Sequence, residues 1–496
     1  MKLTGGVSFK QFIQMAMPLV VAGLMATGCK TYKQQNTVIT EWRQGNITNA
    51  VAIASKKASE STDKNVIVWR LEQATALRAD GQYEESNKAF DQATAKIDEY
   101  SEMAKVRLGQ ESAALLSNQA NLAYEGRSYD GIMASTYIAL NYLALGDTEK
   151  ARPAIIRAYQ RQQEAVEANK RRIEKAREEA EEAAKDKNDQ KAIENAENDP
   201  KFQAALQDST TNLNDVKVYA DYVNPFTVYL DGLFFMANST GTSDYERAVK
   251  SFERMSSFVE GNEYVNQDLA TANDLANGKT ISPTTYVFFE TGCAPIRDQV
   301  RIDIPILISK VSYVGAAFPT LKLQGDFQPV LNVSANGTNY STKLVCSMDS
   351  VINTDFKNEQ PMVITKTIIS TVTKAVAAYI ANDAARQANV WAGLASQIAT
   401  AGYQMAVNIA DTRTWTTLPK EFQVCRFPTP ADGKLELVTP NGIRMPVVLG
   451  SGGGAKVELT SPSAEASLNA GALINVVYVK SITAGTPLLV SQFKLK

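Results

Sequence analysis

Two short motifs in the second half of the chain combine an acid with an arginine, residue types that could bind or cleave a polar substrate. Asp411 and Arg413 are followed by Trp415, and Glu290 is followed by Arg297. An acid and an arginine two positions apart can form an ion pair that fixes the local geometry, with the tryptophan packed behind it. Glycoside cleavage would instead need two opposed carboxylates at a sugar site. We therefore expect structural roles for all five residues and predict no catalytic residue.

The chain contains no histidine among its 496 residues. Histidine is the commonest general base and the commonest metal ligand, so Ser-His and Cys-His triads and histidine-containing zinc sites are excluded. Chemistry based on carboxylates alone remains, as in an enzyme that cleaves peptidoglycan. We predict a protein that is not an enzyme and that uses no cofactor and no metal.

The charge balance bears on the class of partner. Lys and Arg number 51 and Asp and Glu number 53, which gives a formal net charge of −2. Removal of Lys2 and Lys10 with a signal segment would change −2 to −4. Binding of nucleic acid needs a basic excess that neutralises several phosphates. Nucleic acid is therefore not an expected partner.

The start of the chain follows the pattern of an export signal. A basic beginning precedes an apolar run over residues 15–26, which is too short to span a bilayer because a spanning helix needs about 20 residues. Ala26, Thr27 and Gly28 then precede Cys29. This arrangement resembles a bacterial lipoprotein signal, with Ala26 in place of the commoner leucine. The alternative is an ordinary secretory signal followed by an incidental cysteine.

The resemblance to a lipoprotein signal has several implications. It implies a signal peptide over residues 1–28 and a lipidated Cys29 that carries fatty acyl groups such as palmitate. Lipoproteins kept in the inner membrane usually have Asp after the cysteine, whereas this chain has Lys30. The expected location is the outer membrane, with a lipid anchor on the periplasmic face. The sequence leaves open whether the anchor faces the periplasm or the cell surface.

Three further cysteines, Cys293, Cys346 and Cys425, bear on the redox chemistry. An oxidising periplasm permits one disulfide among them and leaves one thiol over. Three unpaired buried thiols are the alternative, and the sequence does not select between the two.

Residues 29–280 repeat a helical pattern with a period of about 34 residues, typical of tetratricopeptide repeats. A glycine ends one helix, an aromatic residue packs into the turn, and small residues let the next helix approach closely. Such units stack into a solenoid, whose inner face commonly holds a peptide or a partner helix. A non-repetitive helical bundle is the alternative. The residues predicted to make the repeat packing are Gly81, Tyr83, Phe90, Ala93, Gly146, Ala151, Tyr245, Ala248 and Phe252.

The segment near residues 160–200 is rich in Ala, Glu, Lys and Arg, all strong helix formers. It has few large apolar residues, so we expect a solvated helix that extends a repeat helix, followed by a polar loop over residues 186–200. A coiled coil with a partner is the alternative, although sustained apolar heptads are missing.

From residue 281 to residue 496 the composition favours a β-rich module, with a helical insertion near residues 362–410. Residues 387–410 carry no charge, but their amides and hydroxyls favour a buried helix or helical hairpin over a membrane span. The glycine-rich residues 450–456 lack the Gly-Lys-Ser/Thr sequence of a phosphate-binding loop, so we expect a hairpin loop. The predicted fold class is α+β and mainly α, a tetratricopeptide-like helical solenoid followed by this module.

Three segments carry a family resemblance, namely residues 139–147, 289–305 and 410–419. Together they resemble a poorly characterised family of Gram-negative lipoproteins with a tetratricopeptide-like N-terminal half and a C-terminal α+β module. The resemblance implies an envelope location and no settled activity. Because such proteins are often encoded near lipoprotein activators of peptidoglycan synthases, it also implies cell-wall assembly as the setting. The charged segment and a long polar stretch around residues 332–360 depart from the family as insertions.

We therefore predict an outer-membrane lipoprotein that acts as a protein–protein interaction scaffold in the periplasm. Its partners would be one or more envelope proteins, and it would reach the membrane through its lipid anchor. The alternatives are a carboxylate-dependent enzyme that cleaves peptidoglycan and a structural subunit of an envelope assembly.

Overall fold

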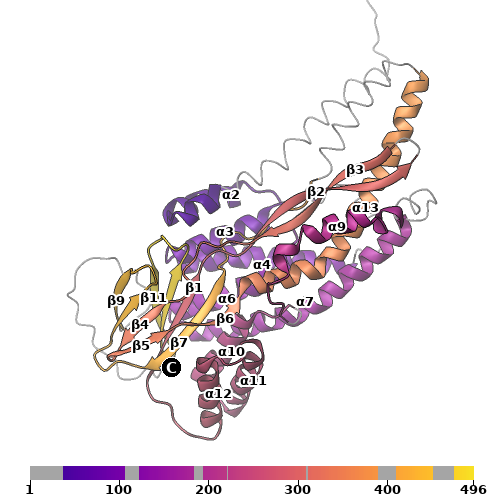
Figure 1. Ribbon diagram of the computed structural model, residues 1–496. Coiled ribbons are helices and arrows are strands. Elements are labelled where there is room, and N and C mark those ends of the chain that lie inside the picture. Colours follow the sequence, from indigo (N-terminus) through magenta and orange to yellow (C-terminus); the bar gives the residue numbers. More distant parts are fainter. Residues whose placement is uncertain are drawn as a thin grey trace, which may run out of the picture.

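The computed structural model describes residues 37–106, 122–183, 194–219, 222–308, 311–388, 409–450 and 474–495. It is an α+β fold, in which a mainly helical N-terminal half precedes β-sheets with one long inserted helix (Figure 1). This confirms the predicted α+β class and the order of a mainly helical half followed by a half with β-sheets. The predicted signal peptide and Cys29 lie outside the described residues.

Antiparallel helix pairs make up the N-terminal half, with α3 against α4, α6 against α7, and α10 against α11. Helix α11 shows why they pair, because Ala248, Phe252 and Met255 recur on one buried face while the opposite face meets solvent. The elements are α2 (Ile47–Glu60), α3 (Val66–Ala79), α4 (Tyr83–Val106), α6 (Ser128–Ala144), α7 (Thr148–Ala183), α9 (Pro200–Asp208), the 3-10 helix η2 (Thr211–Leu213), α10 (Pro225–Ala237), α11 (Thr242–Phe258) and α12 (Glu263–Ala276).

In two of the helix pairs, the two helices are joined by the same kind of turn. Gly81 follows α3 and Gly146 follows α6, with φ angles of 79° and 77°. The next residues, Gln82 and Asp147, donate their backbone N–H groups to carbonyls of the preceding helix at 2.9 and 2.8 Å. This is a Schellman motif, which needs a left-handed residue that glycine supplies at low cost. The glycines therefore end the first helix of each pair where the sequence predicts.

The C-terminal half contains a five-stranded sheet of order β11-β10-β1-β7-β6 and a four-stranded sheet of order β5-β4-β8-β9. The central strand β1 pairs with β10 in parallel and with β7 antiparallel. The strands are β1 (Thr284–Thr291), β4 (Asn332–Ala335), β5 (Thr338–Ser341), β6 (Lys343–Ser347), β7 (Glu421–Pro428), β8 (Lys434–Val438), β9 (Arg444–Val448), β10 (Ile474–Ser481) and β11 (Leu489–Leu495).

The five-stranded sheet is the middle layer of three. On one face of β1, Phe288 meets Phe226 of α10 edge-on, with ring centroids 5.8 Å apart. On the opposite face of the sheet, Phe427 of β7 stacks on Tyr340 of β5 at 4.8 Å. Every residue of β1 is buried as a result. One apolar cluster runs from the helix pairs through this sheet, so the core is continuous across the predicted division at residue 280.

The sheet covers the inner helices of the pairs. Helix α6 buries 15 of its 17 residues and α10 buries 12 of 13, whereas the outer helix α11 buries only five of 17. A helix that is apolar on all sides needs a partner on each side. The inner side of these helix pairs is therefore packed against the β half of the same chain.

An arm projects from this body (Figure 1). It is built from the antiparallel hairpin of β2 (Ile296–Ile308) and β3 (Val311–Lys322), from α9, and from the long helix α13 (Met348–Ala388). At 1.5 Å per residue, α13 is about 60 Å long. The arm has a small apolar core of its own, formed by Phe202, Leu206, Ile302, Ile304, Ala316, Phe318, Ile368, Ile369, Val372 and Ala375.

The inserted helix differs in its limits from the prediction. It begins at Met348 rather than near residue 362, and residues 409–410 are not helical. The polar stretch at 332–360 forms β4, β5, β6 and the first turns of α13. Three of its acids pair with basic side chains of other elements, Asp349 with Lys420, and Asp355 and Glu359 with Arg297, which ties the start of α13 to the folded body. Residues 389–408 and 451–473 lie outside the described residues, and with them most of the predicted helical hairpin and of the glycine-rich loop.

Helix α7 confirms that the first part of the charged segment is helical. Arg161 binds both carboxylate oxygens of Asp98 in α4 at 2.8 Å, which ties the two outer helices together. The predicted polar loop over residues 186–200 is only partly described. Within it, residues 194–197 are helical, and α9 begins at Pro200 because Asp199 caps it by accepting the N–H of Phe202 at 2.8 Å.

Candidate functional site

The predicted ion pair between Asp411 and Arg413 is present. It lies in a non-helical segment, residues 409–420, that directly precedes β7. Arg413 binds the two carboxylate oxygens of Asp411 through Nε and Nη2 at 2.8 and 2.9 Å. Its Nη1 donates to the carbonyls of Lys64 and Leu122 at 3.0 and 2.9 Å. Burial would raise the pKa of Asp411, but Arg413 and then Arg127 lower it below its usual value. The pair fixes this segment to the loops of the helical half.

Trp415 lies behind this ion pair, completely buried. Its ring packs against Phe90 of α4 and Tyr137 of α6, with centroids 5.7 and 5.9 Å away. The indole Nε1–H donates to Thr75 of α3 at 2.9 Å and to Thr417 at 3.0 Å. The segment therefore docks against α3, α4 and α6.

Glu72 of α3 anchors the next two residues. Its carboxylate accepts the backbone N–H and the hydroxyl of Thr416 at 2.6 and 2.7 Å, and those of Thr417 at 3.2 and 2.7 Å. Burial raises the pKa of Glu72 to about 7, although the four donors act in the opposite direction. Sequence reasoning missed this residue, because a glutamate within a helix carries no signal of a distant partner.

Arg297 belongs to a buried chain of alternating charges. Its Nη2 lies 2.6 Å from Glu359 and 3.8 Å from Asp355, both on α13. Glu359 also pairs with Arg127 at the start of α6, and Arg127 lies 3.6 Å from Asp411. The chain thus links the base of the arm to the helical half and to the docked segment.

Glu290, the acid of the second motif, does not pair with Arg297. Strand β1 ends at Thr291 and β2 leaves into the arm, which separates the two side chains. Glu290 instead accepts the hydroxyl of Tyr137 at 3.0 Å and pairs with Lys480, and the hydroxyl of Tyr478 also donates to it. Burial would raise the pKa of Glu290, but Lys480, Tyr478 and Arg78 lower it below the usual value.

A third buried acid lies on the same face of β1 and was also missed from sequence. Asp268 of α12 accepts the hydroxyls of Tyr229 and Tyr286, both at 2.6 Å, and the guanidinium of Arg426 at 2.7 Å. Burial raises the pKa of Asp268, while Arg426 lowers it. Like Glu290, it connects the helical half to the sheet.

The residues predicted to make the repeat packing lie at the contacts between helices. Phe90, Ala93, Ala151, Ala248 and Phe252 are fully buried. Tyr83 is buried as well and Tyr245 is half-buried, while Gly81 and Gly146 form the turns described above.

The three described cysteines, Cys293, Cys346 and Cys425, are all buried and unpaired. Of the two alternatives left by the sequence, the structure has three free thiols. Burial raises the pKa of Cys293 to about 11 and that of Cys346 to about 12. Such thiols are poor nucleophiles near neutral pH.

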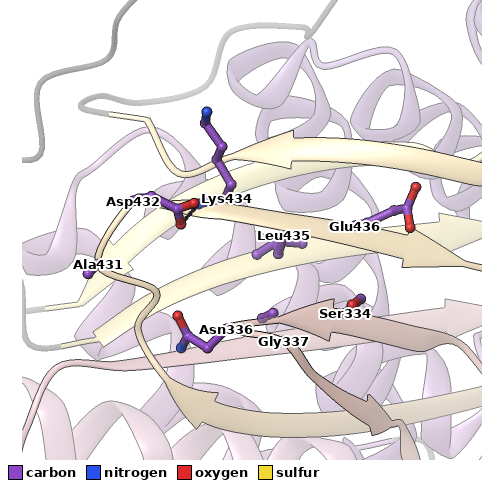
Figure 2. A pocket seen from close by; sticks show the side chains of 9 residues that line it. Ser334, Asn336, Gly337, Ala431, Asp432, Lys434, Leu435 and Glu436 are labelled. Atoms are coloured by element: carbon purple, nitrogen blue, oxygen red, sulfur yellow. Dashed lines mark hydrogen bonds between the residues drawn. The ribbon is translucent and has the colours of Figure 1, made fainter.

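An open pocket of about 450 Å³ lies at the end of the four-stranded sheet. Figure 2 shows it between the β4–β5 turn, with Asn336 and Gly337, and the start of β8. Asp432 accepts the backbone N–H of Lys434 at 3.0 Å, and both residues are exposed. The pocket is polar and open to solvent.

Within the described ranges, no group of three or more Cys, Asp and Glu residues could hold a metal ion. Of the helices described, none is both long enough and apolar enough to cross a membrane. Comparison of the chain with models of protein families, with curated proteins and with solved structures finds no match.

Proposed function

We propose that this chain is an outer-membrane lipoprotein that acts as an interaction scaffold for envelope proteins in the periplasm, with cell-wall assembly as its setting. The cysteine signal at Cys29 supports the anchor. The resemblance of residues 139–147, 289–305 and 410–419 to Gram-negative lipoproteins supports the location and the setting.

The helix pairs of the N-terminal half are, in this proposal, tetratricopeptide-like units. The shared turns at Gly81 and Gly146 support this, as do the buried small residues Ala93, Ala151 and Ala248 at the contacts between helices. The inner side of these units is packed against the sheet of the same chain. A partner would therefore bind elsewhere on the surface.

The arm is the observation that carries the proposal. A hairpin and a long helix that project from the body suit contact with a second protein, because they add surface at a distance from the main core (Figure 1). Its inward side chains, such as Ile302 and Ile304, are buried, whereas Arg301, Asp303 and Tyr313 on the other face of the hairpin are exposed. The partner surface would lie on this outward face.

The buried acids favour a scaffold over a carboxylate enzyme. Glu72, Asp268 and Glu290 each hold two or more donors from a distant part of the chain. A general acid or base needs a side chain within reach of a substrate. These three carboxylates are used to join the two halves of the molecule.

Photocrosslinking in intact cells tests the proposal. A photoreactive amino acid at Tyr313 on the arm is compared with the same amino acid at Val448 on β9, because the two side chains are similarly exposed, at 49% and 46%. We expect a discrete crosslinked protein from position 313 and none from position 448. Equal crosslinking from both positions, or none from either, would overturn the proposal.

A pull-down from solubilised envelopes with Tyr313→Ala and Arg301→Ala gives the complementary result. Both residues are exposed, so the fold should be retained while the partner is lost. Substitutions on α6 or α10 are unsuitable, because those helices are almost completely buried.

A further inference from the structure

A small cavity lies between the α3–α4 turn and the edge of the five-stranded sheet. Its volume is about 70 Å³, room for about two water molecules at roughly 30 Å³ each. It is separate from the arm and from the docked segment. Its lining residues include Arg78, Gly81, Tyr83, Tyr478, Lys480 and Ser491.

Arg78 is the unusual member of this lining. It is 9% exposed, and its Nη1 donates to the side chain of Asn141 at 2.5 Å. The guanidinium carbon lies 4.8, 5.3 and 5.9 Å from the ring centroids of Tyr478, Tyr137 and Tyr83, so three aromatic rings surround it. Among the residues that the structure describes, no carboxylate lies within 4 Å of this guanidinium.

The charges at the cavity do not balance. Glu290 pairs directly with Lys480, so one acid and one base cancel. Arg78 adds a second positive charge, and the acid whose charge acts on it is the same Glu290. The cluster therefore carries one positive charge in excess, in a largely buried place. A buried charge without its own partner is costly, and a bound anion would remove that cost.

We propose that this cavity binds the carboxylate of a small organic acid or of a peptide C-terminus. A guanidinium offers parallel N–H donors that match the planar carboxylate. A single negative charge neutralises the excess, whereas a phosphate dianion would overcompensate it beside Glu290. Ala79 and Leu489 in the lining provide an apolar wall for a small aliphatic group.

Titration calorimetry on the detergent-solubilised full chain tests this inference. The probes are acetate, the dipeptide alanyl-alanine, its C-terminal amide and inorganic phosphate. We expect binding of a carboxylate and at least about tenfold weaker binding of the amide and of phosphate. Equal affinity for the two carboxylates indicates a free small acid as the ligand, and preference for the dipeptide indicates a peptide end. No binding of either carboxylate, or equal binding of the amide, would overturn the inference.

Variants of the protein test whether the carboxylate binds in this cavity. Arg78→Gln should weaken carboxylate binding at least about tenfold. Arg152→Gln is the matched control, because Arg152 also lies over an aromatic ring, 4.9 Å from the centroid of Phe235, but outside the cavity. Ser491→Leu fills the cavity and keeps Arg78, so it tests the site even where Arg78→Gln fails to fold. Unchanged binding in Ser491→Leu, or equal loss in Arg152→Gln, would show that the carboxylate binds elsewhere.

Discussion

One carboxylate oxygen of Glu72 accepts both the backbone N–H and the hydroxyl of Thr416, which is 344 residues further along the chain. The other oxygen binds Thr417 in the same way. Helix α3 thereby holds the segment that leads into β7. The two halves form one body because such contacts cross between them.

Glu72 makes stability depend on pH. Its pKa is raised from 4.5 to about 7 in the folded chain, because burial disfavours the charged form. The folded state therefore binds more protons than the unfolded state between about pH 4.5 and pH 7, and the free energy of unfolding falls as pH rises through that window. We expect this group to lower it by about 2 kcal/mol between pH 5.5 and pH 8.

Urea unfolding of the wild type and of Glu72→Gln at both pH values measures this contribution. Asp130, whose pKa burial raises to about 6, adds a slope of the same sign in both proteins. The difference between the two proteins isolates Glu72. Equal pH dependence in wild type and variant would show that the carboxylate does not titrate in this range.

Trp415 should be a main contributor to the docking of its segment. Trp415→Ala removes a fully buried ring and should cost about 3–5 kcal/mol. Trp415→Phe keeps most of the packing but loses the bonds to Thr75 and Thr417, so about 1–2 kcal/mol is expected. Val448→Ala, at an exposed side chain, should change the free energy of unfolding by less than about 0.5 kcal/mol. A Trp415→Ala variant as stable as Val448→Ala would contradict the docking.

Arg297 should contribute far more to the free energy of unfolding than an exposed arginine does. Arg297→Ala leaves Glu359 and Asp355 without this partner in a buried place, which should cost about 3–5 kcal/mol. Arg444 pairs with Glu436 at 2.8 Å on the surface, and Arg444→Ala should cost less than about 1 kcal/mol. Chemical denaturation of both variants measures the two losses of stability and so compares them. Similar losses in the two variants would show that the buried chain of charges is no more important than a surface pair.

The turn after α6 should depend on the left-handed backbone of Gly146. Gly146 has a φ of 77° and nothing within 4 Å of an added Cβ, so Gly146→Ala probes backbone strain alone. We expect a loss of about 1–2 kcal/mol in thermal or urea unfolding. Gly241 has equally open space but a φ of 176°, which any residue adopts, so Gly241→Ala should be close to neutral. Two equally stable variants would contradict the left-handed turn.

Local features of the fold could be predicted from the sequence. The turns at Gly81 and Gly146 depend on a residue type with a special backbone freedom. The Asp411–Arg413 pair was predictable because its partners are two residues apart. Each of these signals lies within a few positions of the chain.

Long-range partners could not be predicted. Glu290 binds Lys480 rather than Arg297, because the strand order and not the sequence distance brings side chains together. The start of α13 was missed because Asp355 and Glu359 are polar, a pattern typical of a solvated surface, whereas here they are buried against arginines from other elements.

The proposed scaffold role requires the anchor at Cys29, because a scaffold in the envelope must be exported and held there. Metabolic labelling with radioactive palmitate, followed by membrane fractionation, tests this directly in cells that express the wild type or Cys29→Ala. We expect the wild-type protein to be labelled and to co-fractionate with the outer membrane. The variant should carry no label. Unlabelled wild-type protein recovered with the cytosol would contradict the proposed anchor.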